Sequence, residues 1–254
     1  MQLTPLPAFS DNYIWLLDAG ETRLVVDPGD AAPVFAQVAA DGRAPAAVLL
    51  THHHDDHVGG VPALLRRWPG LPVYGPADSR IATVDRPVGD GDRVAVGPWR
   101  FEVIAVPGHT VSHIAFHGEG LLFCGDTLFS LGCGRLFEGT PRDMLGSLER
   151  LAALPAETLV CCGHEYTLAN AAFARVVEPD NPALRHRQAE ATKMRDRGLP
   201  TLPSTLGGEL DGNPFLRIDV PAVRAAVAAR EPGAADDRVA AFAGLRRWKD
   251  GFRA

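Results

Sequence analysis

The chain has 254 residues, of which 46% are hydrophobic and 22% charged, and its formal net charge is −6. This composition is typical of a globular protein with one large domain or two modest ones. The acidic balance argues against a broad nucleic-acid-binding face, and no run of eighteen apolar residues predicts a membrane-spanning helix.

Short apolar runs bounded by turns predict strands through the first part of the chain. They lie at residues 23–27, 46–50, 101–106, 121–124 and 158–162. One helix is predicted over Val58–Trp68, because apolar residues recur there at helical spacing until Pro69-Gly70 ends the pattern. A second helix is predicted over Met144–Leu154.

The pattern becomes helical after about residue 166. Alanine-rich helices are predicted at residues 168–177, 183–197, 220–229 and 236–249, with a Pro- and Gly-rich loop over 199–213. We therefore expect a domain boundary near residues 165–175. The later part also carries more basic residues than the first, which would suit an anionic small molecule.

Two features of the sequence bear on the location of the protein, the N-terminal segment and the cysteines. The first residues, MQLTPLPAFSDNY, have neither a basic start nor a long apolar stretch, so we expect no signal peptide and a cytoplasmic protein. The four cysteines form no C-x-x-C pair and are expected to be reduced and mostly buried, not a zinc ribbon.

Four of the predicted strands lead into a residue that binds metals readily. These residues are His52, His109, Asp126 and His164. In layered α/β folds, sites gather at the sheet edge where strands pass into loops. The sequence therefore predicts that these four side chains converge.

The segment Thr51–His57 concentrates further ligands. Alternate side chains of an extended segment face the same way, so His52 and His54 can enter one site while His53 points away. Asp56 and His57 are expected at the turn before the helix, facing a second metal.

Seven ligands exceed the need of one tetrahedral zinc, so two metals are predicted. Site one takes His52, His54 and His109, site two takes Asp56, His57 and His164, and Asp126 bridges them. Asp27, at the end of a strand, is either a turn residue or a hydrogen-bond partner of a ligand histidine.

The pattern T-H-x-H-x-D-H at Thr51–His57 resembles the metallo-β-lactamase superfamily. Further segments resemble its glyoxalase II (hydroxyacylglutathione hydrolase) family, and the similarity runs almost end to end. They are residues 107–110 (PGHT), 124–140 (CGDTLFSLGCGRLFEGT), 162–170 (CGHEYTLAN), 213–215 (NPF) and 245–250 (LRRWKD).

The resemblance implies an α/β fold, an αββα sandwich followed by a C-terminal helical domain. We place the catalytic domain at residues 1–168 and the glutathione-binding domain at 169–254. It implies hydrolysis of S-D-lactoylglutathione and other S-2-hydroxyacylglutathiones to a hydroxy acid and glutathione, the second step of methylglyoxal removal. It also implies zinc, with iron or manganese as alternatives, on the same seven residues.

The resemblance also implies substrate contacts. They fall on Arg135, Phe137, Tyr166, Asn170, Arg246 and Lys249. Phe137 stands where relatives often carry tyrosine, which removes a hydroxyl contact, and Asp55 stands where they often carry an aromatic residue. Arginine and lysine suit the two carboxylates of glutathione.

The resulting hypothesis is a hydrolase in which a metal-bridging hydroxide, held by Asp56 and Asp126, attacks the thioester carbonyl. A thiolate leaves readily, so no strong general acid is required. The partner is a small-molecule glutathione thioester, with no nucleic acid and no membrane, and the chain is expected to be a monomer.

Three alternatives stay open at this stage. The first is a persulfide dioxygenase or lactonase on the same fold, the second a nucleic-acid-processing member of the superfamily, and the third a metal store or sensor. The seven ligands and the basic tail argue against the first, and the acidic charge argues against the second.

Overall fold

The computed structural model describes residues 1–234 and 237–253. The chain divides into two compact units, each described by itself here. Unit 1 comprises residues 1–105, 112–125 and 161–164, and unit 2 comprises residues 106–111, 126–160 and 165–254.

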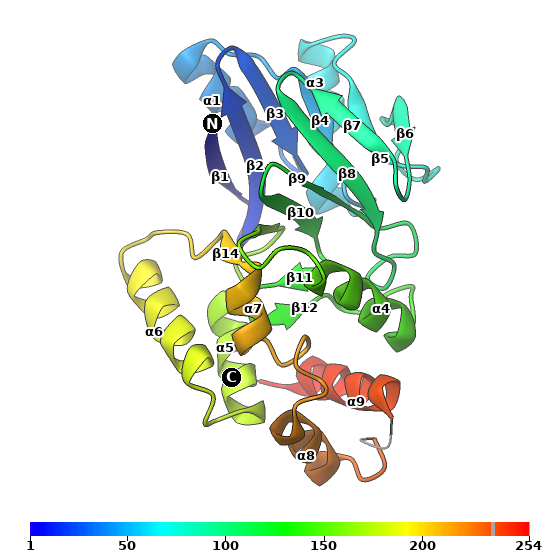
Figure 1. The fold of residues 1–254 in the computed structure, drawn as a ribbon. Helices are drawn as coiled ribbons and strands as arrows, with labels where there is room; N and C mark the ends of the chain where they lie inside the picture. Colours follow the sequence, from blue (N-terminus) through cyan, green and yellow to red (C-terminus); the bar gives the residue numbers. More distant parts are fainter. Residues whose placement is uncertain (235–236, 254) are drawn as a thin grey trace. The chain divides into compact units, whose positions relative to one another are not determined.

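Unit 1 begins with a six-stranded sheet whose strands follow the order of the sequence (Figure 1). They are β1 (Gln2–Ala8), β2 (Asn12–Ala19), β3 (Thr22–Val26), β4 (Ala47–Leu49), β5 (Val73–Pro76) and β6 (Arg86–Val88). The first three strands are antiparallel, and β3 to β6 are parallel. The connections hold the helices α1 (Ala32–Asp41), α2 (Asp55–Val58) and α3 (Val61–Arg67).

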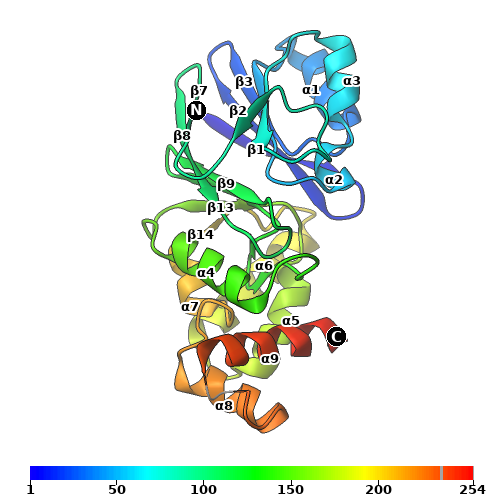
Figure 2. The same cartoon turned by 90° about the vertical axis from the view of Figure 1, so that its right-hand side faces the viewer.

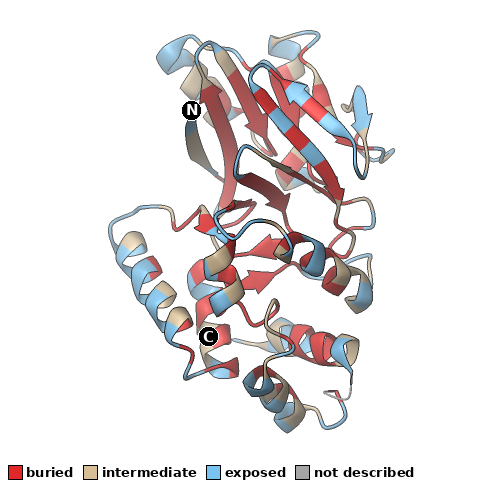
Figure 3. Cartoon of the chain, in the orientation of Figure 1, coloured by how far each residue is buried: buried red, intermediate tan, exposed pale blue. Residues whose placement is uncertain are grey.

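Both faces of the sheet are buried at its central strands, β2 to β4. Ile14 and Leu16 of β2 belong to one apolar cluster with Val34 of α1 and Leu64 of α3. Figure 2 shows α1 and α3 together on one side of the strands. Trp15 points to the opposite face, as strand periodicity requires, and it is also buried. Strands β2 and β3 are buried along almost their whole length (Figure 3), as in a sheet that is covered on both sides.

The second sheet of unit 1 is antiparallel. Its strands are β7 (Arg93–Val96), β8 (Trp99–Ala105), β9 (Ile114–Gly118) and β10 (Leu121–Gly125). Strand β13 (Leu159–Cys162) continues the sheet beside β10, and its last two residues belong to unit 1. The chain leaves β8, β10 and β13 immediately before the segments that carry His109, Asp126 and His164.

Unit 2 is mostly helical. It contains the short strands β11 (Leu128–Phe129), β12 (Gly132–Cys133) and β14 (Ser204–Thr205), and the helices α4 (Pro141–Ala152), α5 (Thr167–Val177), α6 (Pro182–Asp196), α7 (Leu206–Gly212), α8 (Pro221–Arg230) and α9 (Arg238–Gly251). Polar caps start several of these helices. Thr140 and Asp143 form a reciprocal capping box on α4, and the Asn181 side chain caps α6.

The α/β class and most predicted elements are confirmed, but two predictions were wrong. The single helix over Val58–Trp68 is two helices that meet at Gly59-Gly60. Pro62, in the first turn of α3, lacks the amide that a continuous helix would need. The loop predicted over 199–213 contains α7, whose Thr205 side chain accepts from the Gly208 amide and offsets the low propensity of two glycines. Asp236, the first residue of the predicted last helix, lies outside the described residues.

Among the described residues, no helix combines the length and apolar character that a membrane crossing requires.

A buried ion cluster in unit 1 gives a stability prediction. Arg23 of β3 is fully buried and contacts Asp18 at 2.8 Å and Asp41 at 2.6 Å. Removing one member of such a cluster leaves a desolvated charge, so Arg23→Met should lower the free energy of unfolding by about 3 kcal/mol. Chemical denaturation measures this. Arg86→Met, at an exposed arginine of the same unit, should change it by less than about 0.5 kcal/mol; equal effects would contradict the argument.

Candidate metal centre

Unit 1 brings together five of the predicted ligands. His52 and His54 follow β4, Asp56 and His57 lie on α2, and His164 follows β13. His52 Nε2 lies 3.1 Å from His54 Nδ1, and the His52 and His57 rings are 4.2 Å apart between centroids. The placement corrects one expectation: Asp56 and His57 are on a short helix, not in the turn before one.

Asp56, His57 and His164 form a compact donor group. Asp56 Oδ2 lies 3.5 Å from His57 Nε2 and 3.4 Å from His164 Nε2. Tetrahedral ligands at about 2.1 Å from zinc lie about 3.4 Å from one another. The spacing and the mixture of imidazole and carboxylate donors therefore fit a divalent metal ion.

Unit 2 places the remaining two predicted ligands beside each other. His109 Nε2 lies 3.5 Å from Asp126 Oδ2, and both residues are buried. His109 Nδ1 lies 2.9 Å from the Arg135 carbonyl oxygen. Because a carbonyl only accepts, Nδ1 carries the proton and Nε2 is the metal-binding nitrogen.

Carboxylates orient the histidines of unit 1 in the same way. Asp27 Oδ2 lies 3.0 Å from His57 Nδ1, and Asp11 Oδ1 lies 2.8 Å from His164 Nδ1. Asp27 also accepts from the amide and the hydroxyl of Thr51. These hydrogen bonds direct both Nε2 atoms toward Asp56. Of the two interpretations of Asp27 from the sequence, this contact matches the hydrogen-bond partner of a predicted ligand histidine.

A close backbone approach sets the position of α2. A Cβ atom at Gly29 would lie 1.8 Å from the Asp56 carbonyl oxygen, so only glycine fits beside this helix. Asp27, two residues earlier, has a left-handed φ of 51°. The turn after β3 therefore brings the Asp27 carboxylate and the α2 backbone together.

Sequence reasoning missed several residues around these histidines. Asp11 lies in the turn between β1 and β2 and Asn12 begins β2, and Asn12 Nδ2 donates to Asp56 Oδ2 at 2.8 Å. His113, which received no role, stacks on His52 with centroids 4.6 Å apart and planes 15° apart. The only signal was the polar sequence Ser10-Asp11-Asn12 between two apolar runs, which also describes an ordinary turn.

The predicted substrate contacts all belong to unit 2, but they differ in exposure. Phe137 and Arg135 are exposed, and the Phe137 ring lies 5.2 Å from that of His109. Tyr166 is half-buried against Phe129. Asn170 is buried and donates to the Ser130 carbonyl oxygen at 3.1 Å, which ties it to the turn between β11 and β12.

The two basic residues of α9 are not equivalent. Arg246 is buried, donates to the Cys133 carbonyl oxygen at 2.8 Å and pairs with Asp250 at 3.0 Å. Lys249 is half-buried. Burial, with the nearby charges of Arg246 and Arg135, lowers the pKa of Lys249 to about 8. This concentration of positive charge favours binding of an anion.

The cysteine beside this cluster is not a nucleophile at neutral pH. Burial raises the pKa of the Cys133 thiol to about 11 even though Arg246 lies 3.6 Å from its sulfur. The four cysteines are free and buried, as the sequence predicts. The thiolate that covalent catalysis needs is therefore not available.

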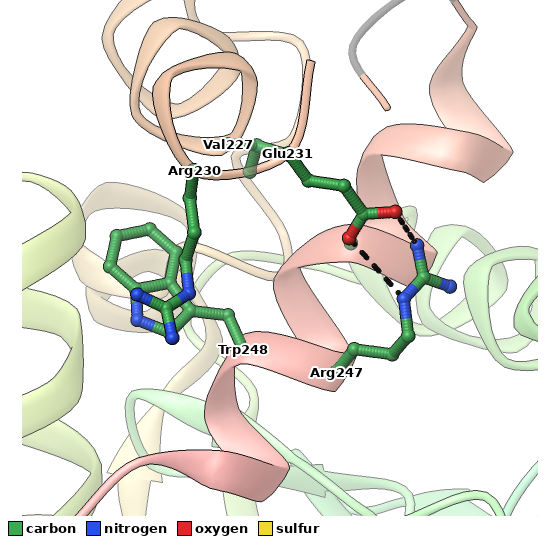
Figure 4. A pocket seen from close by; sticks show the side chains of 6 residues that line it. Val227, Arg230, Glu231, Arg247 and Trp248 are labelled. Carbon is green, nitrogen blue, oxygen red and sulfur yellow. Dashed lines mark hydrogen bonds and ion pairs between the residues drawn. The ribbon is translucent and has the colours of Figure 1, made fainter. Parts of the chain in front are cut away.

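A hollow of about 370 Å³ in unit 2 lies between α8 and α9 (Figure 4). The charged side chains that line it contact other residues of the protein. Arg247 pairs with Glu231 at 2.5 Å, and the Arg230 guanidinium lies over the Trp248 ring at 5.1 Å. We assign it no ligand.

Two family models match the chain. The metallo-beta-lactamase superfamily matches residues 8–164, and the hydroxyacylglutathione hydrolase C-terminus matches residues 165–252. The chain is 60% identical to the hydroxyacylglutathione hydrolase of Xanthomonas axonopodis pv. citri (strain 306), covering 100% of both chains. It is 57% identical to the hydroxyacylglutathione hydrolase of Xylella fastidiosa (strain M23), covering 99% of this chain and 98% of that one.

Solved structures share the fold. The BLEG-1 B3 metallo-beta-lactamase has a TM-score of 0.63 at 25% identity, covering 85% of this chain and 98% of that one. TTHA1623, solved in a di-iron-bound form, has a TM-score of 0.61 at 30% identity, covering 85% and 100%. Two matching family models and full-length relatives at this identity mean that the chain belongs to the hydroxyacylglutathione hydrolase (glyoxalase II) family of the metallo-β-lactamase superfamily.

Proposed function

We propose that this chain hydrolyses S-D-lactoylglutathione, and other S-2-hydroxyacylglutathiones, to the hydroxy acid and glutathione. The observation that carries the proposal is the full-length 60% identity to a protein named hydroxyacylglutathione hydrolase. The donor groups of the two units, with basic side chains in unit 2, support it. The reaction is the second step of methylglyoxal removal.

We propose that two divalent ions bind to all seven predicted ligands, and that the ions are zinc on the basis of the imidazole and carboxylate donors. The seven ligands are His52, His54, Asp56, His57, His109, Asp126 and His164. Iron or manganese are the alternatives, and a relative of this fold was solved with two irons. Bound ions of this kind lower the pKa of water toward 7 and polarise a carbonyl oxygen.

The chain's own residues have distinct tasks in this proposal. Asp56 and Asp126 would hold the attacking hydroxide in place, and Asp27 would fix the orientation of His57. Lys249 and Arg135 would attract the carboxylates of glutathione, and Arg246 would shape their site from within. Phe137, Tyr166 and Asn170 would complete the contact surface.

The remaining assignments are proposals from the sequence. We keep the catalytic domain at residues 1–168 and the glutathione-binding domain at 169–254, near the point where the two family models meet. Monomeric state and cytoplasmic location also stay predictions.

Removing metal tests the reaction. Dialysis against a chelator should reduce hydrolysis of S-D-lactoylglutathione by at least about 100-fold, and added zinc should restore it, because water activation depends on the ions. The same preparations should neither cleave lactones nor consume oxygen with glutathione persulfide. Full thioesterase activity in the metal-free chain would rule the proposal out.

Asp27→Asn tests the orientation of His57. The variant keeps the size of the side chain but has one acceptor oxygen, so it cannot accept from the Thr51 amide and from His57 at the same time, and metal affinity should fall by about 10–100-fold. Competition with a chromophoric chelator measures the affinity. Asp92→Asn, at an exposed turn of unit 1, is the control and should bind metal like the unmodified chain. Unchanged affinity in Asp27→Asn would remove Asp27 from the site.

The lowered pKa of Lys249 predicts a pH dependence of substrate binding. Below about pH 8 the side chain is a cation and attracts glutathione, and above it the charge is lost. KM should therefore rise about fivefold between pH 7 and pH 9, at the scale of one charge-assisted contact in a half-exposed site. Lys249→Gln should have the higher KM at pH 7, nearly the same KM as the unmodified chain at pH 9, and little pH dependence of its own. Lys193→Gln, at the chain's other lysine, is the control and should keep the rise of KM with pH. The same dependence of KM on pH in both variants would contradict the assignment of this rise to Lys249.

A further inference from the structure

Asp11, the last residue of the turn between β1 and β2, and Asn12, the first residue of β2, reach two predicted metal ligands that are far away in the sequence. Asp11 Oδ1 lies 2.8 Å from His164 Nδ1, across 153 residues. Asn12 Nδ2 lies 2.8 Å from Asp56 Oδ2, across 44 residues. Two adjacent residues thus contact two members of the donor group in unit 1.

The backbone holds this turn in place. Asn12 forms a β-bridge with His164, and the Tyr13 amide donates to the Gly163 carbonyl oxygen at 2.8 Å. The buried Trp15 donates from Nε1 to the Cys162 carbonyl oxygen at 3.0 Å. Hydrogen bonds with β2 therefore hold the segment that leads into His164, and none of these contacts involves a metal ion.

The side chains of Asp11 and Asn12 act in different ways on the two predicted metal ligands that they contact. A carboxylate only accepts hydrogen bonds, so Asp11 keeps the proton on His164 Nδ1 and makes Nε2 the donor atom for a metal. The Asn12 amide donates to the same Asp56 oxygen that lies 3.4 Å from His164 Nε2. This contact fixes the rotamer of Asp56. Asn12 is buried, whereas the Asp56 side chain that it contacts is 41% exposed.

We propose that Asp11 and Asn12 are positioning residues that set the affinity of the metal bound by Asp56, His57 and His164. This inference rests on the proposed function. Asp11 acts through the tautomer and orientation of His164, and Asn12 acts through the orientation of Asp56. Neither residue is expected to contribute to glutathione binding, so their loss should lower kcat and leave KM unchanged.

The test compares Asp11→Ala, Asp11→Asn and Asn12→Ala with the unmodified chain. Glu21→Ala is the matched control, since Glu21 is an exposed acid in the next turn of the same sheet, between β2 and β3. Metal equivalents per chain are measured during titration with a chelator, together with kcat, KM and the melting temperature of the metal-free protein.

Asp11→Ala and Asn12→Ala should lose about 10–100-fold in affinity for one of two ions, with a matching fall in kcat and an unchanged KM. Asp11→Asn retains an acceptor oxygen and should be intermediate. The metal-free melting temperatures should stay close to that of the unmodified chain.

Two outcomes would overturn the inference. The first is metal affinity in both alanine variants equal to that of Glu21→Ala. The second is a fall in the melting temperature of the metal-free protein that accounts for the whole loss, since this would mean a structural role only. Neither affects the proposed function, which would instead fail if the unmodified chain bound no metal or cleaved no thioester.

Discussion

The donor group of Asp56, His57 and His164 depends on the hydrogen bonds that Nδ1 of each histidine makes with a carboxylate. Neutral histidine has two tautomers, and only one of them offers Nε2 to a metal. Asp27 selects that tautomer in His57 and Asp11 selects it in His164, both within 3.0 Å. The two carboxylates also place negative charge behind ligands that are themselves neutral, which favours a divalent cation in front of them. Much of the surrounding backbone, from the turn after β3 to the bridge between Asn12 and His164, holds these carboxylates where they are needed.

The sequence predicted the strands, and the positions of His52 and His164 after them, for a simple reason. Apolar runs such as residues 46–50 and 158–162 become buried strands whatever their neighbours are, and the residue after each strand then lies at an edge of the sheet. His52 and His164 could thus be placed in unit 1 without knowledge of the strand order. The clustering of histidines at 52–57 added local geometry, although the helix of Asp56 and His57 was too short to be recognised from periodicity.

The contacts that the sequence could not predict join residues that are distant along the chain. Asp11 and His164 meet because β2 lies beside the segment that follows β13, and nothing in either segment specifies that pairing. His113 is similar, since its stacking on His52 follows from how the chain enters β9 and not from its own neighbours. Burial of Arg246 was missed for a different reason. A basic residue on an amphipathic helix usually lies in solvent, whereas this one is held by the Cys133 carbonyl oxygen and the Phe215 ring.

That difference bears on how an anionic substrate would be recognised in unit 2. The two terminal nitrogens of Arg246 already contact the Cys133 carbonyl oxygen and the Asp250 carboxylate, so replacing those contacts with a ligand would gain little free energy. Lys249 differs from Arg246, because its charged form is destabilised in the protein. Its charge is disfavoured by burial and by neighbouring cations, which lower its pKa to about 8, and an arriving carboxylate would relieve both effects. By linkage, a bound anion raises the pKa of Lys249 and binding takes up protons near pH 8. In the proposed function, Arg246 would thus contribute the positive field and the packing, while Lys249 would contribute the contact that strengthens when the substrate binds.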